Sequence, residues 1–263
     1  MLADDVAVEL LREGRLEVQG RLIEASNATL LCSVEDGDVR AECVYKPVRG
    51  ERPLWDFPDG TLAGREVASY LLSEAFGWSL VPPTLLREGP HGPGMVQLWV
   101  ETGPDSELVD VRSPRDVPSD WLTVLHARDE KGEPVVLAHS DHEELRRLAL
   151  FDVVINNADR KGGHVLCTPG GRVLGIDHGV SLNADEKLRT VLWGWLGRGL
   201  DTVEVRSLER LRGELDGELA DRLGEHITTK EIQALRERIE RLLESGVFPA
   251  PSGEWPAIPW PPF

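Results

Sequence analysis

The chain has 263 residues, 41% of them hydrophobic, and a formal net charge of −17. This length is enough to bury the core of one large domain or of two small lobes. The acidic surface offers no basic stripe for nucleic acid and no cluster of Lys and Arg for an anionic membrane. No apolar run is long enough to cross a bilayer. We therefore expect neither a nucleic-acid partner nor insertion into a membrane.

The start of the chain and its cysteines indicate a compartment. The first ten residues, MLADDVAVEL, are acidic and lack the positive region of a signal peptide. The three cysteines, Cys32, Cys43 and Cys167, are odd in number and scattered, which is typical of a reducing environment. We therefore expect a cytoplasmic protein.

The first part of the chain predicts a short helix followed by antiparallel strands. Residues 6–11 have the apolar spacing of an amphipathic helix, which ends at Gly14. Residues 16–34 are rich in Val, Leu and Ile with polar residues between them, and the Asp-Gly pair at residues 36–37 is typical of a turn. Residues 41–47 alternate as a strand that ends at a proline. These segments predict a three-stranded antiparallel sheet.

A helix and two more strands complete this strand-rich part. Apolar residues at helical spacing within residues 67–75 precede Gly77, which is typical of a helix end. Residues 81–88 and 94–101 predict two strands around a loop rich in Gly and Pro.

The remaining chain is mostly helical in pattern. Residues 103–118 are polar and rich in turn formers, which predicts a linker, and residues 143–154 predict a helix. Residues 165–179 predict a hairpin that turns at its Pro-Gly-Gly sequence. A Thr-x-x-Glu capping box opens a long helix over residues 228–243. The proline-rich residues 254–263 cannot be helical, and we expect them to pack on the body of the protein.

Five side chains with catalytic potential follow in order along these elements. Lys46 ends a strand, Glu66 lies in the next helix, and Asp159 stands in the stretch NNADRKGGHV. His164 follows Asp159 by five residues, and Asp177 follows the hairpin in the stretch IDHG. The two glycines before His164 let the backbone turn, so that the acid and the imidazole face one site.

This order resembles the phosphotransfer machinery of the protein-kinase-like superfamily. The N-x-D-R and I-D-x-G sequences around Asp159 and Asp177 resemble those of phosphatidylinositol 3- and 4-kinases and of the related bacterial HipA-type kinases. The whole chain also resembles an actinobacterial family related to that fold. The resemblance implies an α+β, two-lobed, protein-kinase-like fold. Its N-lobe, residues 1–102, would be an antiparallel sheet with one helix, and its C-lobe, residues 103–263, would be mostly helical.

The resemblance also implies an ATP-dependent phosphotransferase with a role for each side chain. Lys46 would hold phosphate oxygens, and Glu66 would orient Lys46 through an ion pair. Asp159 would accept or steer the proton of the attacking hydroxyl. Asp177 and His164 would bind Mg²⁺ or Mn²⁺.

Two features depart from these relatives. The family has Asn where this chain has His164, and imidazole suits Mn²⁺ or Zn²⁺ better than Mg²⁺. The chain also lacks a G-x-G-x-x-G loop. In its place, the resemblance implies that Ser26, Asn27 and Thr29 of a hairpin at residues 24–29 meet the phosphates.

For the adenine base, the resemblance implies a hinge after the fifth strand. The hinge stretch contains Gln97, Leu98, Trp99 and Val100, whose backbone groups would read the edge of the base. Residues 181–195 stand where the acceptor would be selected and lack the basic character expected for a phosphoinositide headgroup. The acceptor would be a protein hydroxyl or a small soluble alcohol.

Other interpretations of the same residues stay open. Lys46 and Glu66 can be solvated surface charges, Asp177 can belong to a turn, and Asp159 can pair locally with Arg160 for at most about 1 kcal/mol. The order and spacing of the set favour the kinase-like interpretation. Two other functions also remain: a pseudokinase that binds nucleotide or scaffolds a partner, motivated by His164, and a transferase of AMP or another group.

Overall fold

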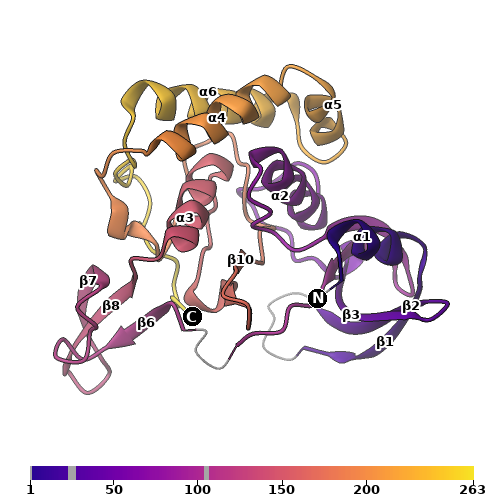
Figure 1. Ribbon diagram of the computed structural model, residues 1–263, viewed down its shortest axis with the longest axis horizontal. Helices are drawn as coiled ribbons and strands as arrows, with labels where there is room; N and C mark the ends of the chain where they lie inside the picture. Colours follow the sequence, from indigo (N-terminus) through magenta and orange to yellow (C-terminus); the bar gives the residue numbers. More distant parts are fainter. Residues whose placement is uncertain (1, 23–27, 104–106) are drawn as a thin grey trace.

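The computed structural model describes residues 2–22, 28–103 and 107–263. The chain forms two lobes, with the strand-rich N-lobe in indigo and purple and the helices α4 to α6 stacked above the rest of the C-lobe (Figure 1). This is the α+β, two-lobed arrangement that the sequence predicts. The lobe boundary at residues 102 and 103 stays a prediction.

The N-lobe is built on a five-stranded antiparallel sheet in the order β1-β2-β3-β5-β4. The turn between its second and third strands lies at Gly37, which has a φ of +56°, as the Asp-Gly pair predicts. The strands are β1 (Arg15–Arg21), β2 (Leu30–Asp36), β3 (Val39–Pro47), β4 (Thr84–Gly89) and β5 (Gly92–Leu98).

Two helices, α1 (Asp4–Glu13) and α2 (Leu62–Phe76), cover opposite faces of this sheet. Side chains alternate between the faces of a strand, so Val96 of β5 joins the buried cluster of α1 and Met95 joins that of α2. Both helices end at the predicted glycines, since Gly14 follows α1 and Gly77, with a φ of +86°, follows α2. One face of the sheet therefore packs through α2 against the core that continues into the C-lobe.

The C-lobe packs four helices and a short hairpin into one core that continues to α2. Helix α6 begins at the predicted capping box, because Thr228 and Glu231 exchange hydrogen bonds between side chain and backbone. The elements are α3 (Glu143–Ile155), α4 (Thr202–Glu214), α5 (Glu218–Gly224), α6 (Thr229–Ser245), β9 (Val165–Cys167) and β10 (Val173–Gly175). Within the described residues, short 3₁₀ helices lie at Val48–Gly50, Gly162–His164 and Trp193–Trp195.

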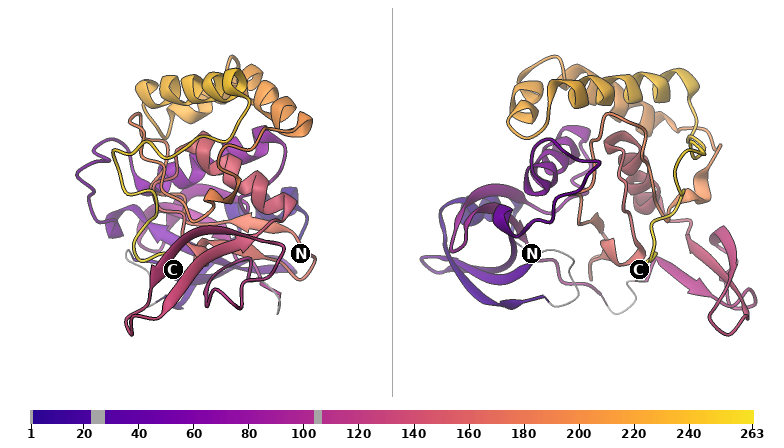
Figure 2. Two further views of the ribbon diagram at one scale, coloured as in Figure 1. Left: turned by 90° about the vertical axis from the view of Figure 1, so that its left-hand side faces the viewer. Right: turned by 180° about the vertical axis from the view of Figure 1, so that it is seen from behind.

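A separate three-stranded sheet, in the order β6-β8-β7, projects from the C-lobe beside α3 (Figures 1 and 2). It consists of β6 (Val109–Arg112), β7 (Trp121–Arg128) and β8 (Pro134–Ser140). The prediction of a linker over residues 103–118 is therefore wrong at β6, which pairs with β8 across more than twenty residues of chain. Such a distant pairing leaves no signal in the local sequence pattern.

Among the helices that the structure describes, none combines the length and the apolar character needed to cross a bilayer. The cytoplasmic location stays a prediction.

Candidate active site

An ion-pair cluster joins the N-lobe to the C-lobe. Nζ of Lys46, at the end of β3, lies 2.6 Å from Oε1 of Glu66 in α2 and also contacts the carboxylate of Asp177. Glu66 is 2% exposed, whereas the side chain of Asp177 is half exposed. The sequence predicts this meeting of residues from three distant segments.

The backbone around Asp177 is tied to the same cluster. The N–H of His178 donates to the second carboxylate oxygen of Glu66 at 3.0 Å, so one glutamate holds both the lysine and the segment after β10. Asp177 itself has a φ of +64°, a left-handed conformation that is uncommon for a residue other than glycine. Backbone strain of this kind persists where the surroundings hold it, and functional sites are where it concentrates.

The charges of the cluster favour a fixed cation beside a fixed anion. Burial lowers the pKa of Lys46, but the carboxylates of Asp177 and Glu66 outweigh burial and leave that pKa raised. The Lys46 ammonium holds the pKa of Asp177 well below its usual range, against the effect of burial. Burial raises the pKa of Glu66. At neutral pH, Lys46 is therefore a cation suited to phosphate oxygens, and Asp177 is an anion suited to a metal ion.

The loop after α3 carries Asp159 and is anchored from within the C-lobe. Helix α3 is followed by Asn156, whose φ of +53° is typical of Asn just after a helix. The Asn157 side chain donates to Asp152 at 2.9 Å and accepts from the N–H of Asp159 at 3.0 Å. These bonds fix the position of the Asp159 backbone relative to α3.

Arg160 supplies the main anchor of this loop. Its fully buried guanidinium pairs with the fully buried carboxylate of Asp152 and also donates to the carbonyl groups of His164 and Ile176. The local pair between Asp159 and Arg160 considered from the sequence is therefore absent from the described structure. The sequence did not predict this role of Asp152, although a single acid in the apolar second half of α3, followed by an arginine, is a signal of a buried pair.

The pKa of the Asp159 carboxyl group lies above its usual value. Burial raises the pKa of Asp159, and Lys161, whose Nζ lies 3.5 Å from Oδ2, lowers it, while Asp177 raises it further. A raised pKa makes a carboxylate a stronger base, which suits the removal of a proton from a hydroxyl.

His164 lies next to Asp177, with 3.3 Å between Nε2 and Oδ2. Burial lowers the pKa of His164 to about 4, so the imidazole is neutral at pH 7 and offers a nitrogen lone pair. Its Nδ1 is buried without a hydrogen-bond partner among the described residues. A neutral imidazole and a carboxylate side by side are a donor pair that fits a divalent metal ion.

This pair does not make a complete metal cage. In the described part of the chain, no group of three or more His, Cys, Asp or Glu residues is placed to hold a metal ion. Two protein ligands suit an ion such as Mg²⁺, which usually keeps waters and takes further ligands from substrate phosphates.

Four of the predicted catalytic and metal-binding side chains line one cavity of about 80 Å³. They are Lys46, Glu66, Asp159 and Asp177. Thr29, from the predicted phosphate loop, lines the same cavity. Ser26 and Asn27, the other two predicted loop residues, lie outside the described residues.

The predicted adenine residues lie elsewhere. Leu98, Trp99 and Val100 line a second cavity of about 1010 Å³, which shares no lining residue with the cavity at Lys46. Gln97 lines neither, because its buried amide donates to the hydroxyl of Thr84 at 2.8 Å. The structure therefore does not bring these four residues together with Lys46, and their contact with a base stays a prediction.

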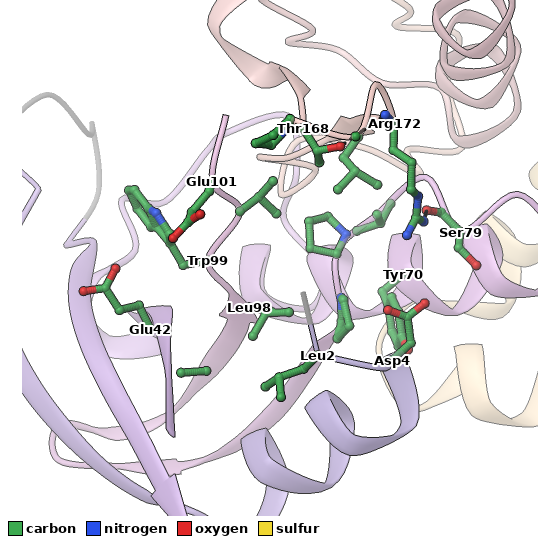
Figure 3. A pocket seen from close by; sticks show the side chains of 18 of the residues that line it. Leu2, Asp4, Glu42, Tyr70, Ser79, Leu98, Trp99, Glu101, Thr168 and Arg172 are labelled. Carbon is green, nitrogen blue, oxygen red and sulfur yellow. Dashed lines mark hydrogen bonds between the residues drawn. The ribbon is translucent and has the colours of Figure 1, made fainter. Parts of the chain in front are cut away.

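The larger cavity is bounded by both lobes (Figure 3). Trp99, Glu101 and Glu42 lie at one side of the picture, and Arg172 and Ser79 lie at the other. The Arg172 guanidinium donates to the carbonyl of Ser79 at 3.1 Å. This contact joins the turn between β9 and β10 to the loop after α2.

The segment at residues 181–195 uses its two cations internally. Nζ of Lys187 lies 3.2 Å from the carboxylate of Asp56, and the Arg189 guanidinium donates to the carbonyl of Ala158 at 2.8 Å. The partner of Lys187 comes from the loop between β3 and α2. Neither cation is available for an anionic headgroup in this arrangement.

The chain is similar to one known protein in sequence and to another in structure. No model of a known protein family matches the chain. The chain is 51% identical over 263 residues to the Mycobacterium tuberculosis protein Rv2133c, covering 97% of this chain and 94% of that protein. Among solved structures, the Helicobacter pylori proinflammatory kinase CtkA is similar with a TM-score of 0.45 and 13% identity, over 90% of this chain and 94% of that one. At this distance, the structural likeness carries no argument on function.

Proposed function

We propose that this chain, which belongs to the same family as protein Rv2133c of Mycobacterium tuberculosis, is an ATP-dependent phosphotransferase of the phosphatidylinositol 3- and 4-kinase-like type. One observation carries the proposal. Four ionisable side chains from four separate segments border a single cavity: Lys46, Glu66, Asp159 and Asp177. An excess of carboxylates around one partly buried cation is more typical of a functional site than of a stabilising core.

Each residue has a task in this mechanism. ATP with its divalent metal ion supplies, when bound, the phosphoryl group and part of the charge neutralisation. Lys46, held by Glu66, would place a positive charge against phosphate oxygens. Asp177 and His164 would hold the metal ion. Asp159 would take the proton of the acceptor hydroxyl, for which its raised pKa suits it.

The acceptor that we propose is a protein hydroxyl or a small soluble alcohol. A phosphoinositide headgroup would need cations beside the site, and Lys187 and Arg189 are already bound to partners within the chain. The net charge of −17 also opposes an anionic acceptor surface.

The test measures release of ADP and labelling of acceptors with ATP and Mg²⁺ or Mn²⁺. We expect Asp159→Asn and Asp177→Asn each to abolish transfer while the melting temperature stays nearly unchanged. Asp38→Asn, at an exposed turn, is the matched control and should retain activity. Turnover that survives in both site variants would reject the assignment.

A pseudokinase is a second candidate, favoured by the presence of His164 where relatives have Asn. Calorimetry with ATP and either metal ion, run beside the turnover assay, separates the two functions. Tight binding without turnover would favour the pseudokinase. Mass spectrometry of modified acceptors would identify a nucleotidyl transferase by the larger mass that it adds.

A further inference from the structure

The proline-rich segment at residues 247–263 leaves the end of α6 and descends the C-lobe toward β10 (Figures 1 and 2). The carbonyl of Ala257 accepts hydrogen bonds from the N–H of Thr190, at 3.1 Å, and from the indole N–H of Trp193, at 2.8 Å. Further along, the carbonyl of Pro262 accepts from the N–H of Gly162 at 2.8 Å. The segment therefore crosses the proposed acceptor region and ends against the loop that carries Asp159.

An aromatic contact fixes where the segment crosses. Nζ of Lys187 lies 3.7 Å from the ring centroid of Trp255 and 5.6 Å from that of Trp55. A cation held over aromatic rings and paired with a carboxylate is stabilised on both sides. The register of the segment over residues 187–193 is thus set before it reaches Gly162.

The ring of Phe263 packs directly against Gly162. A Cβ atom added to Gly162 would lie 2.0 Å from Cε1 of Phe263, so a larger residue would displace the ring. A Cβ atom added to the next residue, Gly163, would meet nothing within 4 Å. The two glycines therefore differ: Gly162 contacts Phe263, whereas Gly163 has open space where a side chain would lie.

The loop needs such a contact at this position. Arg160 anchors its first half, and the carbonyl of His164 is held by Arg160 and by the N–H of Ile176. Between these anchors lie two consecutive glycines, the residues with the largest conformational freedom. The hydrogen bond to Pro262 and the ring of Phe263 restrict that freedom.

We infer that Pro262 and Phe263 are positioning residues that hold Gly162, so that Asp159 and His164 face the same nucleotide. This inference rests on the proposed phosphotransferase function for its kinetic consequence. Its structural part, the immobilised loop, stands on the contacts of Gly162 alone.

The test compares Phe263→Ala with Trp260→Ala in the full chain. Trp260 is 88% exposed and lies in the same segment, so its substitution is a matched control. Hydrogen–deuterium exchange of the Gly162 amide should become about fivefold or more faster in Phe263→Ala and stay unchanged in Trp260→Ala. In the turnover assay, kcat should fall about tenfold with little change in KM for ATP, because Lys46 and Asp177 are untouched. Phe263→Leu should restore most of both values.

A second substitution tests the same contact from the side of Gly162, so that the inference does not depend on normal folding of Phe263→Ala alone. Gly162→Ala should lower kcat in the wild-type background and cost much less in the Phe263→Ala background, because the methyl group then has room.

Unchanged exchange in Phe263→Ala would overturn the inference, and so would faster exchange with a raised kcat, which would make the segment an inhibitor. A wild-type chain without turnover would reject the proposed phosphotransferase. Faster exchange in Phe263→Ala would still support the holding role in that case.

Discussion

The buried pair between Arg160 and Asp152 allows a sharp test of how the catalytic loop is held. Both side chains are fully buried, and Nε of Arg160 lies 2.9 Å from Oδ2 of Asp152. Arg160→Met removes the cation and leaves a carboxylate in a site without solvent. Breaking one partner of a buried pair costs about 3–5 kcal/mol.

The size of the effect depends on what remains around each partner. In Arg160→Met, Asp152 keeps the amide of Asn157 at 2.9 Å and the hydroxyl of Thr190 at 3.4 Å, so we expect the lower end, about 3 kcal/mol. Asp152→Leu leaves a buried guanidinium and should cost about as much. In the double variant both charges are gone, and the total cost should lie within about 1 kcal/mol of the cost of Arg160→Met alone.

Urea unfolding followed by tryptophan fluorescence measures these free energies of unfolding. Arg212→Met is the control, because its pair with Glu240, at 3.4 Å, is about half exposed and should contribute less than about 1 kcal/mol. A cost below about 1 kcal/mol for Arg160→Met would refute the reasoning, and so would strictly additive costs in the double variant.

Three further predictions concern pH, the metal ion and a helix start. Burial lowers the pKa of His139 to about 4 from 6.5, so its contribution to stability is present above pH 6.5 and is lost as pH falls toward 4. In this window, the free energy of unfolding of the wild type should fall by up to about 1.4 kcal/mol per pH unit more than that of His139→Asn. Equal slopes of the two proteins would contradict this prediction. His164→Asn should raise the ratio of the affinity for Mg²⁺ to that for Mn²⁺ by about tenfold, measured by calorimetry with ATP. An unchanged ratio would mean that His164 is not a metal ligand. Thr61→Ala should lower the free energy of unfolding by about 1 kcal/mol, because the Thr61 hydroxyl accepts from the N–H of Gly64 at the start of α2; urea unfolding checks it, and no change would mean that the cap is dispensable.

Features that depend on neighbouring residues were predictable from the sequence. Gly77 ends a helix and the turn at Gly37 joins two strands, because both adopt the positive φ that glycine favours. Strands β7 and β8 are consecutive and form a hairpin that the sequence prediction lacks. The pairing of β6 with β8 is not predictable, because it joins strands that are not consecutive in the chain. Local patterns do not carry the free energy of such pairings.

The same division applies to the site. Lys46, Glu66 and Asp177 are predictable because their order along the chain resembles that of the protein-kinase-like superfamily, and the structure places them in contact. The packing of Phe263 on Gly162 was not predictable, since it joins positions about a hundred residues apart through shape alone. The sequence predicts only that residues 254–263 pack on the body.

The charge of the site argues for a metal ion as the partner of any nucleotide. Its cavity holds one cation, Lys46, among the carboxylates of Glu66, Asp159 and Asp177, and His164 beside it is neutral. A polyanion that entered this cavity alone would meet an excess of like charge at a distance where the repulsion is not screened. A divalent cation on Asp177 and His164 would neutralise that excess and let Lys46 meet phosphate oxygens. The cluster is therefore consistent with a site in which nucleotide and metal ion bind together, and the low pKa of Asp177 keeps its carboxylate ready for that ion at neutral pH.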